Sequence, residues 1–558
     1  MITQAKVSGR MLLFAAIIFL TSLTSVGSHS GQSGQTTCPP IPSSWTGFNA
    51  NLKYYSLYPG YPSYDPHPRY LGELSGSWRE IGEQYGQKAG DLIRMVFEGW
   101  FFEVVQIQGS IDAVREYVRQ QEQYYKALAP EALELMEGIA RGAAAELDKS
   151  AYAGILTHYE KILVINSYWG LKGAPAGRIL KAEKSTAAGA AADEAVACSG
   201  AVILGKGTAD GKVIHCSSED QHFFPQEYLV TYIVHPVDKN AHTYTVTASS
   251  GEIGSEHAMN DRGVVVSGYA GGGVDIGSPS ISFPFSGYER PGLDWQLGCW
   301  YAAAFSNTAK QAVELLTVGR PEYREKSGYK IVIGKCIKGA NWVVSDLHEA
   351  YVVESIPADL NGVARYAVRR PGDIGEEGDY IVSTNNVEAK ESYDEQNVHD
   401  PGHPMSQHGS SLRNPVYGLG VNGGTGTRFM TFMWLIKNNY GHITPDMVKT
   451  WRTAHYVYDL HGTRHDFLDV EGHGRVSPHL VPGIGTLCAH SKGPAGSDPF
   501  TGSNIYVSLS VPQDLTVYRT KGRPCEWRGP WDAITLLPNP ATASPTPNRE
   551  RAGRRGLS

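Results

Sequence analysis

The stretch Asp193–Asp220, DEAVACSGAVILGKGTADGKVIHCSSED, decides the fold of this 558-residue chain. An alanine-rich segment ends at Cys198, and the apolar run SGAVILG follows it at once. The ADGK turn then leads into a second apolar run and an acidic end at Asp220. Two apolar runs joined by a glycine-containing turn predict a β-hairpin. The first strand therefore begins at a cysteine that directly follows a low-complexity segment.

The chain before this stretch is predicted to be mainly helical. Residues 81–166 carry apolar side chains at three- and four-residue steps, which is the period of an amphipathic helix. Pro130 fits the first turn of the second helix in this region. Residues 171–197 are rich in Ala, Gly and Lys and have little to bury, which favours an exposed linker. We therefore expect a helical pro-region over residues 29–170, followed by this linker.

After Cys198, short alternating runs replace the helical period. These runs are SGAVILG, KVIHCS, YLVTYIVHP, HTYTVTASS, GVVVSGYA, KIVIGK, NWVVSD, AYVVESI and YIVST. Such runs favour β-strands, and helices are expected near Trp295–Leu316 and Thr427–Asn438. We therefore expect an α+β catalytic part over residues 198–536. The tail, residues 537–558, has a Pro- and Arg-rich composition typical of disorder.

The N-terminus has the pattern of a secretory signal peptide. Lys6 and Arg10 precede the apolar run Met11–Leu20, and small residues follow to Ser28. This apolar core is short for a membrane span, so we expect a signal peptide over residues 1–28 and no membrane anchor. The expected location is secreted, periplasmic or another exported compartment, or the lysosome in a eukaryote.

Export implies an oxidising compartment, in which cysteine pairs form disulfides. The chain has seven cysteines, so at least one is unpaired. If Cys198 is that one, six cysteines remain and up to three disulfides are possible, but the sequence does not pair them.

Net charge and histidine spacing bear on two kinds of partner, nucleic acids and metal ions. The formal net charge is −7 with no basic run, which argues against nucleic acid. The segment HGTRHDFLDVEGH brings His461, His465 and His473 near acidic residues, but their spacing is loose for zinc. We therefore expect no metal and no other cofactor, and assign these histidines to a loop or a substrate rim.

Cys198 is the candidate nucleophile. If the Ala197–Cys198 bond breaks, Cys198 becomes the first residue of a strand and carries a new α-amine. A free α-amine has a pKa of about 7.7–8.0, so it can accept the thiol proton near neutral pH. A thiol paired with its own base is a pattern of covalent catalysis.

The order of motifs resembles the N-terminal-nucleophile (Ntn) hydrolases. The closest resemblance is to the family of acyl-CoA:6-aminopenicillanic acid acyltransferase, with penicillin V acylase, bile salt hydrolase and acid ceramidase as relatives. It spans roughly residues 70–510 and rests on LSGSWREIGEQYGQKAGD, ELMEGIARGAA, the opening stretch from Cys198, AMNDRGVVVSGYAGG, NWVVSDLHEAYVVES, STNN and TGTRF. The resemblance implies a four-layer αββα sandwich, cleavage between Ala197 and Cys198, and an N-acyl amine substrate.

The resemblance also implies a set of site residues. Cys198 matches the nucleophile, Asp220 an acid near the new α-amine, Asn385 an oxyanion donor, and Arg428 an arginine that orders the catalytic groups. The segment Gly268–Tyr269–Ala270 stands where a second oxyanion contact is expected, through backbone N–H groups. His215 is expected to pack or to form a substrate wall.

Each of these residues also has a structural alternative. Cys198 could be half of a disulfide or a buried thiol, and Asp220 could cap a turn. Asn385 could hold a turn, with Asn386 as a neighbouring competitor, and Arg428 could form a surface ion pair.

The chain departs from the family next to Asp220. Relatives often carry an Arg-Asn pair there, whereas this chain has Ser217, Ser218 and Glu219. Two other functions therefore stay open: a dipeptidase of the cysteine Ntn type, and a non-catalytic exported binding protein on the same fold.

Overall fold

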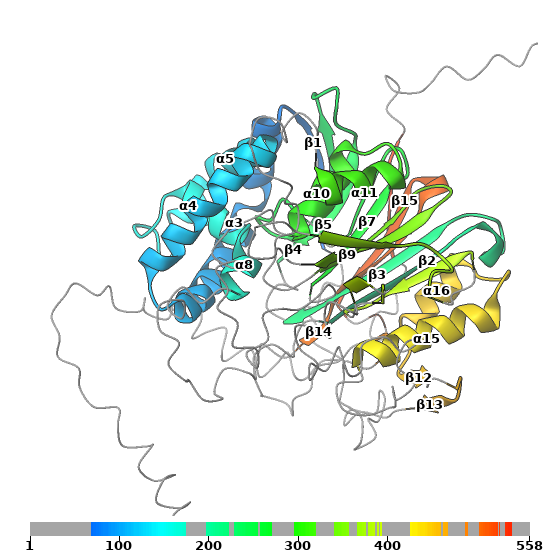
Figure 1. Ribbon diagram of the computed structural model, residues 1–558. Coiled ribbons are helices and arrows are strands. Elements are labelled where there is room, and N and C mark those ends of the chain that lie inside the picture. The colour runs from blue at the N-terminus through cyan, green and yellow to red at the C-terminus, as the bar shows by residue number, and fades with distance from the viewer. Residues whose placement is uncertain are drawn as a thin grey trace, which may run out of the picture. The chain divides into compact units, whose positions relative to one another are not determined.

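The computed structural model describes residues 68–173, 197–222, 228–254, 257–270, 295–319, 340–356, 365–374, 378–385, 388–389, 391–392, 424–458, 461–466, 486–488, 502–522, 524 and 531–537. The expected signal peptide lies outside these residues, as do nearly all of the linker and of the tail. Two sheets lie face to face in the described part, each with helices on its outer face (Figure 1).

Sheet A has eight strands in the order β1-β4-β5-β6-β7-β8-β9-β10. Their bounds are β1 Arg69–Gly76, β4 Leu229–Pro236, β5 Tyr244–Ser249, β6 His257–Asn260, β7 Val265–Ala270, β8 Ala340–Ser345, β9 Ala350–Ile356 and β10 Arg365–Arg369. β1 pairs parallel to β4, and the other neighbours pair antiparallel. The predicted pro-region therefore supplies an edge strand to this sheet, which its helical period did not predict.

Sheet B has six strands in the order β11-β2-β3-β14-β15-β16. Their bounds are β11 Tyr380–Ser383, β2 Ala197–Ile203, β3 Ile214–His222, β14 Gly502–Val511, β15 Thr516–Lys521 and β16 Asp532–Thr535. The predicted hairpin is confirmed, because β2 pairs antiparallel with β3 through the turn that contains Gly211, whose φ is 79°. A separate two-stranded sheet pairs β12 (Tyr456–Tyr458) with β13 (Arg464–Asp466).

Helices from two parts of the chain cover the outer face of sheet A (Figure 1). From the pro-region these are α3 Trp78–Gln108, α4 Ile111–Leu128, α5 Pro130–Gly142, α6 Ala144–Leu147, α7 His158–Ile165 and α8 Tyr168–Gly173; from the later part they are α10 Trp295–Phe305 and α11 Ala309–Val318. A capping box between Ser77 and Glu80 starts α3, and Pro130 starts α5 as predicted.

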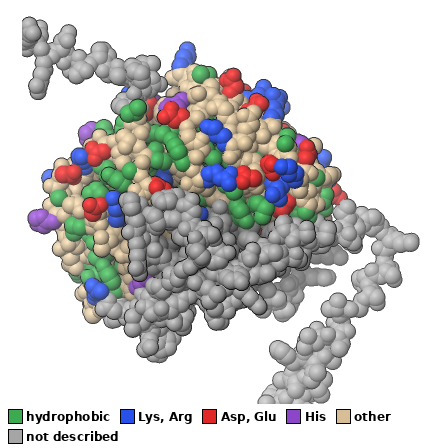
Figure 2. Space-filling view, turned by 180° about the vertical axis from the view of Figure 1, so that it is seen from behind, with side chains coloured by type: hydrophobic (Ala, Val, Ile, Leu, Met, Phe, Trp, Pro, Cys, Tyr) green, Lys and Arg blue, Asp and Glu red, His purple; other side chains and the backbone are tan. Residues whose placement is uncertain are grey.

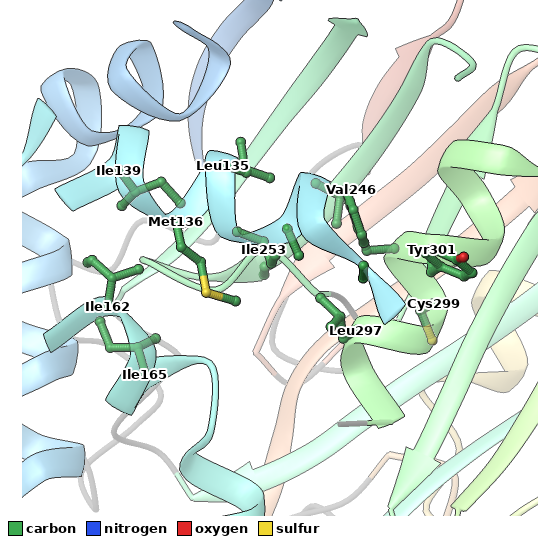
Figure 3. Close-up of a cluster of buried hydrophobic side chains, with 14 of the residues drawn as sticks. Leu135, Met136, Ile139, Ile162, Ile165, Val246, Ile253, Leu297, Cys299 and Tyr301 are labelled. Atoms are coloured by element: carbon green, nitrogen blue, oxygen red, sulfur yellow. The ribbon is translucent and has the colours of Figure 1, made fainter. Parts of the chain in front are cut away.

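The largest core lies between these helices and sheet A. Apolar side chains from α5, α7, β5 and α10 meet there (Figure 3), among them Met136, Ile165, Val246 and Leu297. The pro-region and the catalytic part therefore share one core.

Glycines let α3 and α5 cross at close range. Gly82 and Gly86 on α3 face Gly138 and Gly142 on α5. A Cβ on Gly86 would lie 2.3 Å from the carbonyl oxygen of Ile139, closer than any side chain permits. The GEQYG spacing in the first motif thus corresponds to a helix–helix contact.

The outer face of sheet B is covered by α15 (Gly424–Asn439) and α16 (Pro445–Trp451). Ala201 and Ile203 of β2 pack toward these helices, whereas Cys198 and Val202 pack toward sheet A. This alternation is the ordinary period of a strand between two layers. The predicted αββα sandwich is confirmed, and the nucleophile candidate faces the space between its sheets.

Cys198, Cys216, Cys299 and Cys488 are buried, and no disulfide joins any two of these described cysteines. Cys38, Cys336 and Cys525 lie outside the described residues, so the disulfides stay a prediction. The predicted strand KIVIGK lies outside the described residues.

On the face of the described part that Figure 2 shows, acidic and basic side chains lie interspersed. In the described residues no helix combines the length and apolar character needed to cross a membrane.

Candidate active site

Strand pairing brings Asp220 and Asn385 close to Cys198. In the β2–β3 hairpin, Cys198 lies opposite Glu219 and Ala197 opposite Asp220. On the other side of β2, Ser383 of β11 lies opposite Gly200. Because these strands run antiparallel, the turn after Ser383 continues toward the beginning of β2. Asp220 and Asn385, far apart in sequence, therefore flank the same short segment.

The side-chain oxygen of Asn385 accepts two hydrogen bonds beside Cys198. The backbone N–H of Cys198 donates to Asn385 Oδ1 at 2.5 Å. Arg428, in the first turns of α15, donates to the same oxygen from Nη2 at 3.0 Å. Its other nitrogen, Nη1, donates to Asp220 Oδ2 at 3.0 Å. The structure thus brings together the four residues predicted from the sequence, and all four are buried.

These contacts orient the Asn385 amide. An amide oxygen accepts hydrogen bonds, whereas its nitrogen donates two. Because Oδ1 receives both Cys198 and Arg428, Nδ2 is the opposite, donating end of the group. A donor fixed beside the Cys198 backbone is what an oxyanion formed on a Cys198-bound carbonyl would need.

Asp220 and Arg428 form a buried ion pair at 3.0 Å. Removing one partner of such a pair costs about 3–5 kcal/mol, because the other charge stays buried without compensation. The pair holds the guanidinium so that its second nitrogen reaches Asn385. The alternative of a surface ion pair for Arg428 does not apply, since its side chain is fully buried.

Arg452 is a site neighbour that the sequence analysis missed. It follows α16 directly and donates to the carbonyl oxygen of Ser199 at 2.5 Å and to the Ser199 hydroxyl at 3.0 Å. It also reaches the Ser218 hydroxyl at 3.3 Å. A buried guanidinium therefore lies beside Ser199 of β2 and Ser218 of β3, close to Cys198 and Asp220. No local signal marks Arg452, because WRT ends an ordinary helix and the contact is tertiary.

The second thiol of the hairpin has a different environment. Cys216 is fully buried on the face of β3 toward α15. Burial raises the pKa of the Cys216 thiol, and the charge of Arg452 only partly opposes this shift. Cys216 therefore stays protonated near neutral pH and is not a competing nucleophile.

The segment Gly268–Tyr269–Ala270 lies on β7 of sheet A. Tyr269 faces Cys198 in the core between the sheets, whereas Gly268 faces α10, where a Cβ would lie 2.8 Å from the Trp295 ring. A Cβ on Gly200 would lie 2.0 Å from the Tyr269 hydroxyl, so Gly200 makes room for this ring. The backbone role of the segment stays a prediction.

His215 packs between the sheets in a network of hydroxyl groups. Its ring nitrogens contact the hydroxyls of Ser345 at 2.8 Å and Ser267 at 2.9 Å. Ser267 also contacts His257 Nδ1 at 2.9 Å. Burial lowers the pKa of His215 to about 3 and moves the pKa of His257 down as well. Both imidazoles are therefore neutral near pH 7.

The histidines of HGTRHDFLDVEGH are only partly described. His461 is exposed and His465 lies on β13, whereas His473 lies outside the described residues. Among the residues that are described, no group of His, Cys, Asp and Glu side chains is arranged to hold a metal ion.

Comparison with known proteins gives matches only among solved structures. No family model matches the chain, and no curated protein sequence matches it. The chain is similar to a penicillin V acylase from Agrobacterium tumefaciens at 13% identity and a TM-score of 0.30, covering 58% of this chain and 82% of that one. It is also similar to a mutant conjugated bile acid hydrolase from Clostridium perfringens at 12% identity and a TM-score of 0.32, covering 61% and 92%. These matches are too distant to assign an activity to this chain.

Proposed function

We propose that this protein is an exported cysteine amidohydrolase or acyltransferase of the Ntn type, which activates itself by cleavage before Cys198. The observation that carries the proposal is the contact of the Cys198 backbone nitrogen with Asn385, which Arg428 and Asp220 hold in place. This arrangement supports chemistry at Cys198, the second residue of β2.

Self-cleavage would use the same Cys198 sulfur as the later reaction. The Cys198 sulfur attacks the carbonyl carbon of Ala197 and an S–C bond forms, and the C–N bond to Cys198 breaks as its nitrogen takes up the proton that the thiol gives up. Water then hydrolyses the thioester to a carboxylate on Ala197. The products are a Cys198 thiol and a new α-amine beside Asn385.

In the mature enzyme, the α-amine accepts the thiol proton and the thiolate attacks the carbonyl of an N-acyl amine. The carbonyl electrons move onto oxygen, where the Nδ2 end of Asn385 is the proposed donor. The intermediate then expels the amine, which takes the proton back from the α-ammonium group. Water or another amine finally releases the acyl group from sulfur.

The cleaved pro-region is proposed to stay bound as a second chain. It contributes β1 to sheet A and most of the helices in the largest core. Losing this chain would expose a large apolar surface, which opposes separation.

Self-cleavage is tested first. The exported form and a Cys198→Ala variant are compared by intact mass and N-terminal sequencing. We expect wild type to give a chain that begins Cys-Ser-Gly-Ala, and the variant to stay whole. A correctly folded wild type that stays whole would contradict the proposal and favour a binding protein.

Substrate class is tested second. Mature wild type is assayed against N-acyl amines and against dipeptides. Hydrolysis of N-acyl amines that Cys198→Ala lacks is the expected result. Turnover of dipeptides alone would replace the proposal with the dipeptidase alternative, and full activity in Cys198→Ala would exclude Cys198 as the nucleophile.

A further inference from the structure

The turn that carries Asn385 lies beyond the end of its strand. The pairing of β11 with β2 ends at Ser383, opposite Gly200, so ladder hydrogen bonds do not fix the residues that follow. The Asn385 oxygen nevertheless has to meet both the Cys198 backbone and Arg428. Something outside sheet B must therefore hold this turn.

Two buried polar side chains of sheet A, Arg369 and Asn341, hold the residues that precede Asn385. Arg369 of β10 donates from Nη2 to the carbonyl oxygen of Val382 at 2.9 Å. Asn341 of β8 donates from Nδ2 to the carbonyl oxygen of Thr384 at 3.0 Å and contacts the Ser383 hydroxyl at 3.3 Å.

Glu354 of β9 holds the residues that follow Asn385. The backbone N–H of Glu388 donates to Glu354 Oε1 at 2.9 Å. The backbone N–H of Ala389 lies 3.1 Å from Oε1 and 3.0 Å from Oε2. These donors lie three and four residues after Asn385, so the carboxylate holds the chain on that side of Asn385.

Arg369 and Glu354 are joined to each other. Arg369 Nε donates to Glu354 Oε1 at 2.8 Å, and both side chains are buried. Hydrogen bonds to an ionised acceptor are about twice as strong as neutral ones. One ion pair thus links Val382, three residues before Asn385, to Glu388 and Ala389, which follow it.

We propose that Glu354, with Arg369 and Asn341, is a positioning residue that sets the Asn385 amide against Cys198. Glu354 does not touch the reacting atoms and acts only through the Asn385 turn. The inference rests on the proposed function, because it assigns Glu354 to the same reaction. It also gives a purpose to NWVVSDLHEAYVVES, which contains both Asn341 and Glu354 and has no other assigned role.

The test uses mature enzyme and p-nitrophenyl butyrate, an activated ester that requires no particular amine. Glu354→Gln keeps the shape of the side chain and removes its charge. We expect kcat to fall on the order of 10- to 100-fold, since a displacement of about 1 Å at a reacting group can cost that much, with little change in KM.

Asp261→Asn is the matched control. Asp261 is a buried carboxylate that pairs with His242 at 3.3 Å and lies in the turn between β6 and β7. Its loss should lower the melting temperature without lowering kcat. If both variants lose kcat only in proportion to the folded fraction, Glu354 is an ordinary stabilising charge and the inference is wrong.

A double-mutant cycle separates positioning from general structure. If Glu354 acts through Asn385, Glu354→Gln causes little further loss of kcat in an Asn385→Ala background. Full additivity of the two changes would overturn the inference. If Glu354→Gln does not fold, Asn341→Ala, which leaves the ion pair intact, replaces it in the same cycle with the same expected result.

Different outcomes refute the proposed function and the positioning role of Glu354. Equal ester turnover by wild type and Cys198→Ala would refute the proposed function. Turnover that depends on Cys198 but is unchanged in Glu354→Gln and in Asn341→Ala would refute only the positioning role.

Discussion

At the scale of single residues, Asn385 is the most informative position. Its side-chain oxygen accepts hydrogen bonds from the Cys198 backbone and from Arg428, so one amide connects three parts of the chain. The sequence pointed to Asn385 only through the short STNN match, with Asn386 as a competitor. The contact with Cys198 supports Asn385.

Replacing Asn385 by alanine removes the proposed oxyanion donor and the acceptor for Cys198. We expect kcat to fall about 10²–10³-fold, as for other oxyanion donors, while the fold persists. Steady-state kinetics with circular dichroism measure both effects. Undiminished kcat in a folded Asn385→Ala protein would show that another group stabilises the oxyanion.

Residue-level prediction from sequence had a clear limit. Cys198, Asp220, Asn385 and Arg428 lie in motifs whose order along the chain is informative. Arg452 reaches the site only because α16 packs on sheet B, and no local pattern encodes that packing. A sequence read one segment at a time cannot find such a residue.

At the scale of elements, periodicity predicted most strands and helices after Cys198. It missed β14, although β14 lies next to β3 near the middle of sheet B. It also missed β1, whose partner β4 lies far along the chain and pairs with it in parallel. Register and partner choice depend on contacts between distant segments, which alternation alone does not specify.

The crossing of α3 and α5 gives a prediction at this scale. In Gly86→Ala, the new Cβ would fall 2.3 Å from the Ile139 carbonyl oxygen and would force the helices apart. Overpacking of this kind typically costs about 1–3 kcal/mol. Gly154→Ala is the control, because no atom lies within 4 Å of a Cβ there. Thermal unfolding should show a lower melting temperature for Gly86→Ala alone; equal values would mean that the helices can separate freely.

His215, a buried residue of β3, gives a prediction about the pH dependence of stability. Burial lowers the pKa of His215 from 6.5 to about 3. Between these values the unfolded chain binds a proton that the folded protein does not, so stability falls as pH drops below 6.5. Unfolding free energies measured by denaturant titration at several pH values should show this slope.

His215→Gln removes this proton-binding difference. The variant should lose stability less steeply with acid than wild type does, whatever its stability at pH 7. His461→Gln, at an exposed position, serves as the control. An unchanged slope in His215→Gln would assign the acid sensitivity to other groups.

At the scale of the whole molecule, the pro-region is part of the fold. Its strand completes sheet A and its helices form one side of the largest core. After cleavage at Cys198, we therefore expect both chains to elute together in size-exclusion chromatography. Expression of residues 198–558 alone should give insoluble protein. Soluble, active protein from that fragment would show that the pro-region is dispensable.

β1 and β4 pair in parallel but lie on opposite sides of the proposed cleavage site, so cleavage changes the molecularity of unfolding. In the uncut precursor one molecule unfolds to one chain, so its melting temperature does not depend on protein concentration. In the cleaved protein the partners of this pairing are on separate chains, and unfolding yields two molecules from one. By mass action, the melting temperature of the cleaved form should rise with its concentration, while that of Cys198→Ala should stay constant.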